Sequence, residues 1–259
     1  MNRFLLSIFN SLILLCNTQN LIFAEEPDAK ELVKRAVEHW RGISSDEKNT
    51  GAETRAMMQI VRPSYTSNLE LHAFTGGRKN SLVRFTAPPK DAGNATLMRG
   101  DEVWTYNPRT ARVVKIPPSM KAQSWMGSDF SYQDLAKDDE IINQYDHVEI
   151  KRFEKAGRSF RVVKCTPHDN APVVWGKEEL EIRDDYIIEV HRYFDQKDNL
   201  VKTLTADESG MLGGRIYPIV MTMKNEETGN STKITHTFAD FSVILEDNFF
   251  SVTNLRRGR

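Results

Sequence analysis

The sequence predicts a mainly β protein built on one strongly curved antiparallel sheet, and three observations lead to this prediction. About thirteen short segments between residues 55 and 242 are strand-like, and apolar and polar residues alternate in the clearest of them. Most are joined by turns too short for the crossovers that parallel strands need. Only one long amphipathic helix precedes them. We therefore expect the sheet to close into a barrel, or to form a half-barrel plugged by helices, because either arrangement protects the sheet edges.

The first 24 residues are typical of an export signal. Arg3 is followed by an apolar run from Phe4 to Leu15, and Ala24 lies at the expected cleavage point. The run is shorter than the ~20 residues that span a bilayer, which disfavours an uncleaved anchor. Lipidation at Cys16 is disfavoured because Leu15, rather than a small residue, precedes it. We expect a periplasmic protein with a single domain over residues 25–259, in which Cys165 is a small buried hydrophobe.

The helix is predicted to begin after Asp28, which can cap it, and to end at Gly42. Glu31 stands three residues after the cap, as in a capping box. The apolar residues recur at helical spacing and form one stripe that must be buried. This stripe consists of Leu32, Val33, Ala36, Val37 and Trp40.

The strand pattern is clearest over Tyr65–Phe74, where Leu69, Leu71 and Ala73 fall on one face and polar residues fall on the other. A glycine-rich turn then leads into the next strand, which indicates a hairpin. The full set of expected strands is Arg55–Arg62, Tyr65–Phe74, Ser81–Phe85, Ala95–Arg99, Glu102–Tyr106, Arg112–Ile116, His147–Glu154, Ser159–Thr166, Lys177–Arg183, Ile187–Phe194, Leu200–Asp207, Ile216–Lys224 and Thr232–Ser242.

One segment, Pro117–Glu140, interrupts the strands. It is too long for a turn and unusually apolar for an ordinary solvated loop, and Ser131–Ala136 is expected to form a helical turn. Irregular segments of this length are often lids or binding loops. Its apolar residues are Met120, Trp125, Met126, Phe130, Tyr132 and Leu135.

Few sequence patterns indicate a catalytic, metal-binding or nucleic-acid-binding site. The 35 Lys and Arg balance 36 Asp and Glu, which argues against nucleic acid as the main partner. There is no Gly-x-Ser-x-Gly motif, no phosphate-binding glycine loop and no paired histidine motif. A Ser128–Asp129 pair could be combined with a distant histidine (His147, His168 or His191), but any chain of this length offers such triples. We expect no enzyme activity, no metal and no cofactor.

Apolar residues are the more informative feature. Eight methionines follow the signal, several in strands and two in the irregular segment. Each could be ordinary core, but methionine also adapts to ligands of several shapes. A barrel of this size often encloses a cavity. Such a cavity favours an acyl chain, because each buried CH₂ contributes ~0.8 kcal/mol.

Residues Ile116–Met120 and Ser124–Leu135 together resemble the bacterial family of outer-membrane lipoprotein-sorting proteins, relatives of LolA and LolB. The stretches Ser81–Phe85, Val103–Pro108 and Phe238–Phe241 support the resemblance, which covers roughly residues 40–255. It implies an incomplete antiparallel barrel whose helical lid closes over a hydrophobic cavity. It also implies a periplasmic carrier of a lipid or a lipoprotein acyl chain, closer to soluble LolA than to lipid-anchored LolB.

Two functions are the main candidates, and a hydrolase with a non-standard site at Ser128 is the third. In the first, a carrier transfers its lipid towards the outer membrane. In the second, an interaction module uses the irregular segment to dock onto an inner-membrane lipid exporter. The predicted cavity wall consists of Leu69, Leu71, Phe85, Met98, Trp104, Ile188, Val190 and Phe238. The predicted lid or docking residues are Met120, Trp125, Met126, Phe130 and Tyr132.

Overall fold

The computed structural model describes residues 26–43, 50–136 and 140–257. The predicted export signal, with Cys16, lies outside these residues. Within the described part of the chain, no helix has the length and apolar character needed to cross a membrane.

The described residues contain thirteen strands, and all of them belong to one antiparallel sheet. Each strand corresponds to one of the expected segments, so the mainly β prediction is confirmed. The strands are β1 (Thr50–Arg62), β2 (Tyr65–Gly76), β3 (Asn80–Ala87), β4 (Ala95–Arg99), β5 (Glu102–Asn107), β6 (Arg112–Lys115), β7 (Tyr145–Lys155), β8 (Arg158–Pro167), β9 (Lys177–Arg183), β10 (Ile188–Phe194), β11 (Leu200–Leu212), β12 (Arg215–Asn225) and β13 (Ser231–Ile244).

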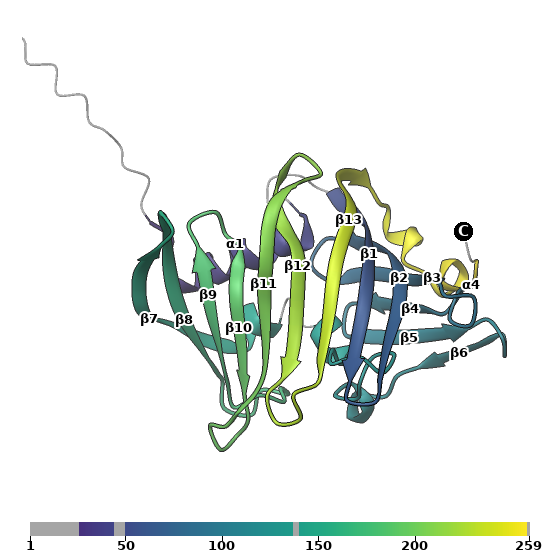
Figure 1. The fold of residues 1–259 in the computed structure, drawn as a ribbon, viewed down its shortest axis with the longest axis horizontal. Coiled ribbons are helices and arrows are strands. Elements are labelled where there is room, and N and C mark those ends of the chain that lie inside the picture. Colours follow the sequence, from purple (N-terminus) through teal and green to yellow (C-terminus); the bar gives the residue numbers. More distant parts are fainter. Residues whose placement is uncertain (1–25, 44–49, 137–139, 258–259) are drawn as a thin grey trace, which may run out of the picture.

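The sheet consists of two antiparallel meanders that meet at the centre of the sheet. Strands β1 to β6 follow one another to one edge, and β7 to β13 run from the other edge back to the centre, where β13 pairs with β1. Figure 1 shows how the strand direction turns from β11 to β5 as the sheet twists. The edge strands β6 and β7 do not pair, so the sheet is not a closed barrel.

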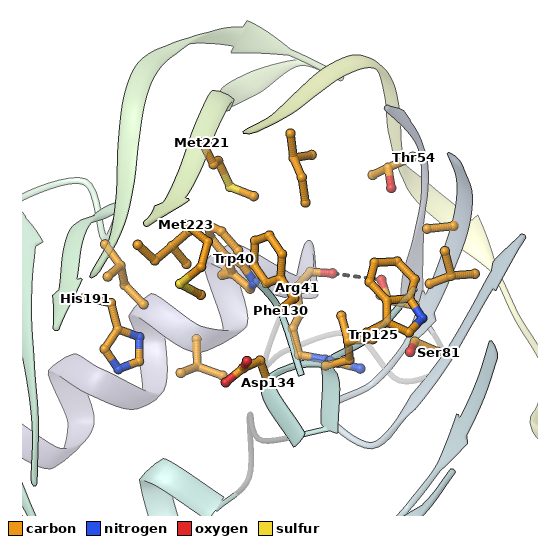
Figure 2. A pocket seen from close by; sticks show the side chains of 18 of the residues that line it. Trp40, Arg41, Thr54, Ser81, Trp125, Phe130, Asp134, His191, Met221 and Met223 are labelled. Atoms are coloured by element: carbon orange, nitrogen blue, oxygen red, sulfur yellow. Dashed lines mark hydrogen bonds between the residues drawn. The ribbon is translucent and has the colours of Figure 1, made fainter. Parts of the chain in front are cut away.

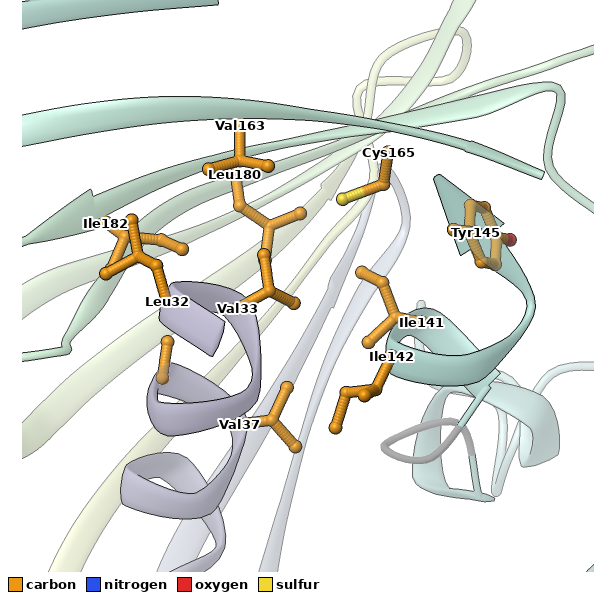
Figure 3. Packing of buried hydrophobic residues seen from close by; sticks show 11 residues of the cluster. Leu32, Val33, Val37, Ile141, Ile142, Tyr145, Val163, Cys165, Leu180 and Ile182 are labelled. Atoms are coloured by element: carbon orange, nitrogen blue, oxygen red, sulfur yellow. The ribbon is translucent and has the colours of Figure 1, made fainter. Parts of the chain in front are cut away.

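Helix α1 (Ala29–Arg41) begins and ends where the sequence predicts. The Asp28 carboxylate accepts a hydrogen bond from the Glu31 backbone N–H at 2.7 Å, and Gly42 adopts a left-handed φ of 71°. The buried stripe of α1 packs on β7 to β9 and on the short helix α3 (Glu140–Asn143) (Figure 3). This cluster encloses Cys165, which is fully buried. Burial raises the pKa of its thiol.

The edge strands β6 and β7 are consecutive in the chain, so the segment between them must cross from one edge of the sheet to the other. This crossing segment, residues 116–144, contains the turn η1 (Pro118–Met120) and the helices α2 (Tyr132–Ala136) and α3. We call the sheet face that carries α1 and this segment the inner face.

The C-terminal part of the chain covers the opposite, outer face of β3 to β5. Turn η3 (Asp247–Phe249) and helix α4 (Val252–Arg256) bring Phe250 and Leu255 against Leu82 and Leu97. The buried Arg84 guanidinium of β3 holds this helix against the sheet. It donates hydrogen bonds to the carbonyl of Leu255 at 3.0 Å and to that of Asn254. A cation at the C-terminal carbonyls of a helix is favourable.

Candidate ligand cavity

A cavity of about 220 Å³ lies between the inner face of the sheet, helix α1 and the crossing segment. Figure 2 shows Met221, Met223 and His191 on one side of it and Trp125 on the other. Its wall is mostly apolar because inward residues alternate along each strand. The apolar strand residues that line it include Ala56, Leu71, Val83, Met98, Leu180, Leu204, Met221, Met223 and Ile234.

A hairpin-like turn within the crossing segment reaches into this space. We call residues 124–131 the aromatic hairpin, because Ser124 and Ser131 bridge and the Trp125 N–H donates to the Phe130 carbonyl at 2.7 Å. The Trp125 Nε1–H also donates to Thr96 Oγ1 at 3.0 Å. Trp125 and Phe130 are only 2% and 6% exposed. Both rings therefore point inward and line the cavity.

The hydroxyl of Ser128 stabilises this turn. It is buried and donates to the Trp125 carbonyl at 2.6 Å, while Asp129 pairs with Arg62 at 2.9 Å. Both side chains are therefore engaged in contacts that stabilise the crossing segment. Among the described residues, no group of three or more His, Cys, Asp or Glu side chains is arranged to hold a metal ion.

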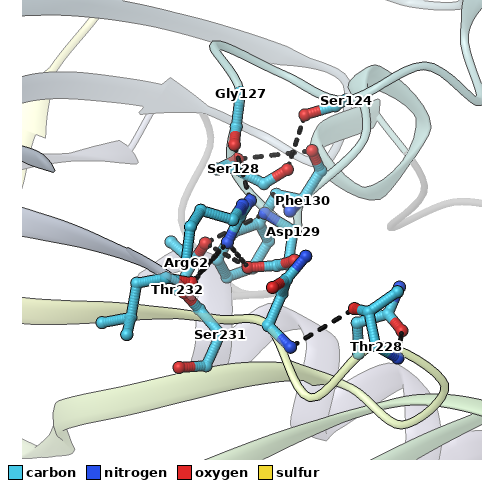
Figure 4. A network of polar contacts seen from close by, with 12 residues as sticks. Arg62, Ser124, Gly127, Ser128, Asp129, Phe130, Thr228, Ser231 and Thr232 are labelled. Carbon is cyan, nitrogen blue, oxygen red and sulfur yellow. Dashed lines mark hydrogen bonds and ion pairs between the residues drawn. The ribbon is translucent and has the colours of Figure 1, made fainter. Parts of the chain in front are cut away.

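Polar anchors tie the crossing segment to both halves of the sheet. Figure 4 shows Arg62 of β1 donating to the Asp129 carboxylate and, at 2.6 Å, to the Gly127 carbonyl. Asp129 also accepts from Thr232 of β13 at 2.6 Å. Further along the segment, the Asp134 carboxylate pairs with Lys202 of β11, and both side chains are nearly buried. Breaking a buried pair on one side is costly, so these contacts hold the segment in place.

A second polar group lies in the cavity wall beside β9 and β10. Glu178 is 1% exposed and accepts from the Tyr145 hydroxyl at 2.8 Å. Its other oxygen lies 2.6 Å from His191 Nε2. Burial and the Glu178 carboxylate raise the pKa of Tyr145, so this hydroxyl keeps its proton and remains a donor.

His236 is the other histidine in the wall. Burial lowers the pKa of His236, and its Nδ1–H donates to the Pro218 carbonyl at 2.9 Å. Burial therefore favours the neutral imidazole, which avoids an unpaired charge facing the apolar space.

The structure brings several of the predicted residues to this cavity. Leu71, Met98 and Ile188 line it, as do Trp125 and Phe130. Leu69 and Phe85 are buried in the adjoining cluster, where the Phe85 ring centroid lies 5.3 Å from that of Trp125. The remaining lid residues differ in exposure. Met126 and Tyr132 are half-buried against this cluster, whereas Met120 is 39% exposed.

Three of the predicted wall residues lie elsewhere. Phe238 is 39% exposed because a β-bulge at Thr237 reverses the alternation of β13. Val190 is displaced by a similar bulge at Glu189, which leaves His191 and Tyr193 on the cavity side. Trp104 pairs with Leu97 and packs on the outer face, under the C-terminal segment.

The sequence interpretation missed several cavity residues. Met221 and Met223 belong to the eight methionines that follow the signal, and their i, i+2 spacing already places them on one face of a strand. Leu204 and Ile234 carry the same alternation signal. Glu178 and His191 gave no such signal, because charged residues in a strand normally indicate a wet face.

Several solved structures share this fold at low sequence identity. A domain from Vibrio parahaemolyticus, provisionally described as an outer membrane lipoprotein-sorting protein, is 22% identical with a TM-score of 0.76, over 88% of this chain and 98% of that domain. A DUF1329 family protein from Desulfovibrio piger has the same identity and TM-score over 88% and 100%. A LolA superfamily protein from Nitrosomonas europaea is 16% identical with a TM-score of 0.69, over 87% and 98%.

At these identities the likeness establishes the fold, which is that of the LolA superfamily and of the Vibrio domain. No curated protein matches the sequence. A family model described as "Uncharacterized protein" matches residues 77–257, which is most of the chain. The protein therefore belongs to this family and has a LolA-type fold.

Proposed function

We propose that the protein is a periplasmic carrier, a single domain over residues 25–259 that holds an acyl chain of a lipid or lipoprotein and takes it towards the outer membrane. The observation that carries this proposal is the apolar cavity enclosed between the sheet and the crossing segment of a LolA-type fold. The predicted export signal supports the compartment.

The size of the cavity fits part of a hydrocarbon chain. Its volume of about 220 Å³ exceeds the ~150 Å³ of an apolar cavity that takes up benzene. At ~0.8 kcal/mol for each buried CH₂, a segment of about six carbons would gain roughly 5 kcal/mol. A longer chain requires the aromatic hairpin to shift, since Trp125 and Phe130 form part of the wall.

The proposed role is non-catalytic. The residues that could have formed a nucleophilic site are used structurally, because Ser128 stabilises the aromatic hairpin and Asp129 anchors it to Arg62. Replacing Ser128 with Ala and assaying ester hydrolysis tests this: a serine-dependent activity in the unmodified protein would contradict a carrier role.

The carrier function is tested by identifying the lipid that stays bound to the protein during purification. Protein secreted into a bacterial periplasm and gently extracted should release lipid when analysed by mass spectrometry. The delipidated protein should then bind the apolar dye N-phenyl-1-naphthylamine, and lipid should displace the dye. Absence of both lipid and dye binding would overturn the proposal.

Docking onto an inner-membrane lipid exporter is the second candidate, and one exposed feature favours it. Turn η1 presents Met120 at 39% exposure, flanked by exposed Pro118 and Ser119. Trp125 and Phe130, by contrast, are buried and could not contact a partner in this conformation. Under this alternative, Met120→Glu should abolish co-purification with the exporter and leave dye binding unchanged.

A further inference from the structure

A second hollow adjoins the cavity on the side of the aromatic hairpin. This outer cleft has a volume of about 430 Å³ and lies between the hairpin, Val174 and Trp175, and the ends of β11 and β12. Its lining is more polar than that of the cavity and includes Ser124, Ser131 and Gln133.

One thin layer of side chains separates the two spaces. Phe130 lines both of them. Beside it, Asp134 lines the cavity and Lys202 lines the cleft, and these two residues form the buried ion pair. We call Phe130 and this pair the partition.

Within the partition, Phe130 is the residue whose side chain is held by packing alone. Its hydrogen bonds are made by the backbone alone, from the Trp125 N–H to its carbonyl and from its N–H to Ser128 Oγ. The ring can therefore rotate without breaking a hydrogen bond. Trp125 differs, because its ring donates to Thr96, and the Asp134–Lys202 pair is held by charge.

The charges that line the cleft are already compensated. Arg62 donates to the Asp129 carboxylate and to the carbonyls of Val61, Gly127 and Ser231, and Lys202 pairs with Asp134. A charged group entering the cleft would lose water without gaining a counter-ion, whereas hydroxyls or amides can hydrogen-bond to its polar rim.

We propose that the outer cleft is the head-group site of an amphiphile with an uncharged, hydroxyl- or amide-bearing head, whose alkyl chain passes Phe130 into the cavity. This assignment rests on the proposed carrier function. Phe130 then sets the rate of exchange, while the residues that line only the cavity set the affinity.

The rate is tested by stopped-flow binding of N-phenyl-1-naphthylamine to Phe130→Leu and Phe130→Trp, two variants that keep an apolar side chain at this position. Relative to the parent, the smaller side chain should raise the association rate constant about tenfold and the larger should lower it. Met223→Leu is the matched control, because Met223 lines the cavity alone and should leave this rate unchanged. Equal association rates in all four proteins, each checked for folding by circular dichroism, would overturn the role of Phe130.

The head group is tested by competition against the dye with amphiphiles of one chain length, below their critical micelle concentrations. Monolauroylglycerol should displace the dye at about tenfold lower concentration than laurate or dodecyltrimethylammonium. Ala122 is exposed and lines the cleft, so Ala122→Lys should improve competition by laurate, and Ala122→Gln should not.

The outcomes separate the two proposals. If the parent protein binds neither the dye nor monolauroylglycerol, the carrier function fails and the head-group site fails with it. If it binds both, but charged and uncharged heads compete equally and Ala122→Lys has no effect on laurate, the head-group site alone is wrong.

Discussion

Filling the cavity should stabilise the protein and block its ligand at the same time. Ala56 lies in the middle of β1, is 7% exposed and lines the cavity. Ala56→Leu adds three carbons that can enter this space. At ~0.8 kcal/mol for each buried carbon, the free energy of unfolding should rise by about 2 kcal/mol. For a chain of this size that corresponds to an increase in Tm of about 4–8 °C.

An Ala→Leu substitution in a closely packed region should have the opposite effect on the free energy of unfolding. Ala36 of α1 is completely buried in the cluster around Cys165 and does not line the cavity. Ala36→Leu should therefore overpack this cluster and lower the free energy of unfolding by about 1–3 kcal/mol. Differential scanning calorimetry of the two variants and the parent measures both effects.

Ligand binding completes this test. Ala56→Leu should weaken binding of N-phenyl-1-naphthylamine about tenfold or more, whereas Ala36→Leu should leave it unchanged if the variant is folded. If Ala56→Leu destabilised the protein as much as Ala36→Leu does, the region would be solidly packed, and both the cavity and the carrier role inferred from it would be refuted.

Three further perturbations follow from contacts in the fold. Arg84→Met should release the C-terminal helix and cost about 1–3 kcal/mol, which limited proteolysis reports as early cleavage near residue 252; unchanged cleavage would contradict the capping role. Burial lowers the pKa of His236 from its usual 6.5, so protonation favours the unfolded chain. Stability should therefore be complete above about pH 6.5 and fall as the pH drops below it, and this loss should be smaller in His236→Gln when urea midpoints are compared. The Cys165 thiol, whose pKa is raised by burial, should react with iodoacetamide only after unfolding; modification of the native protein would show that its cluster opens.

Alternating sequence patterns predicted most of the sheet because one face of each strand is buried. The same reasoning failed where bulges occur, since one extra residue reverses the alternation and a single sequence does not mark its position. This placed Val190 and Phe238 on the wrong face. The prediction for Trp104 was wrong for another reason. The C-terminal segment covers the outer face of β5, so both faces of this strand carry buried apolar residues. Apolar character alone therefore could not show which residues of β5 lie on the inner face.

The candidate site was predictable where it is apolar. The aromatic residues of the crossing segment indicated a lid or binding loop, and the structure places Trp125 and Phe130 in the cavity wall. The ionic contacts that fix this segment were not predictable, because Asp129 and Asp134 look like ordinary loop residues until the fold brings Arg62 and Lys202 beside them. Such pairs depend on tertiary structure, which local patterns do not encode.

The pairing of β1 with β13 also determines how the polypeptide can acquire its structure. Arg55 and Thr237 are hydrogen-bonded there although 182 residues separate them. Contacts this distant raise the contact order and slow folding, because a long loop must close before they form. The pairing of β1 with β13 cannot form until β13 has been synthesised, so the two unjoined halves of the sheet must be kept from aggregating until then.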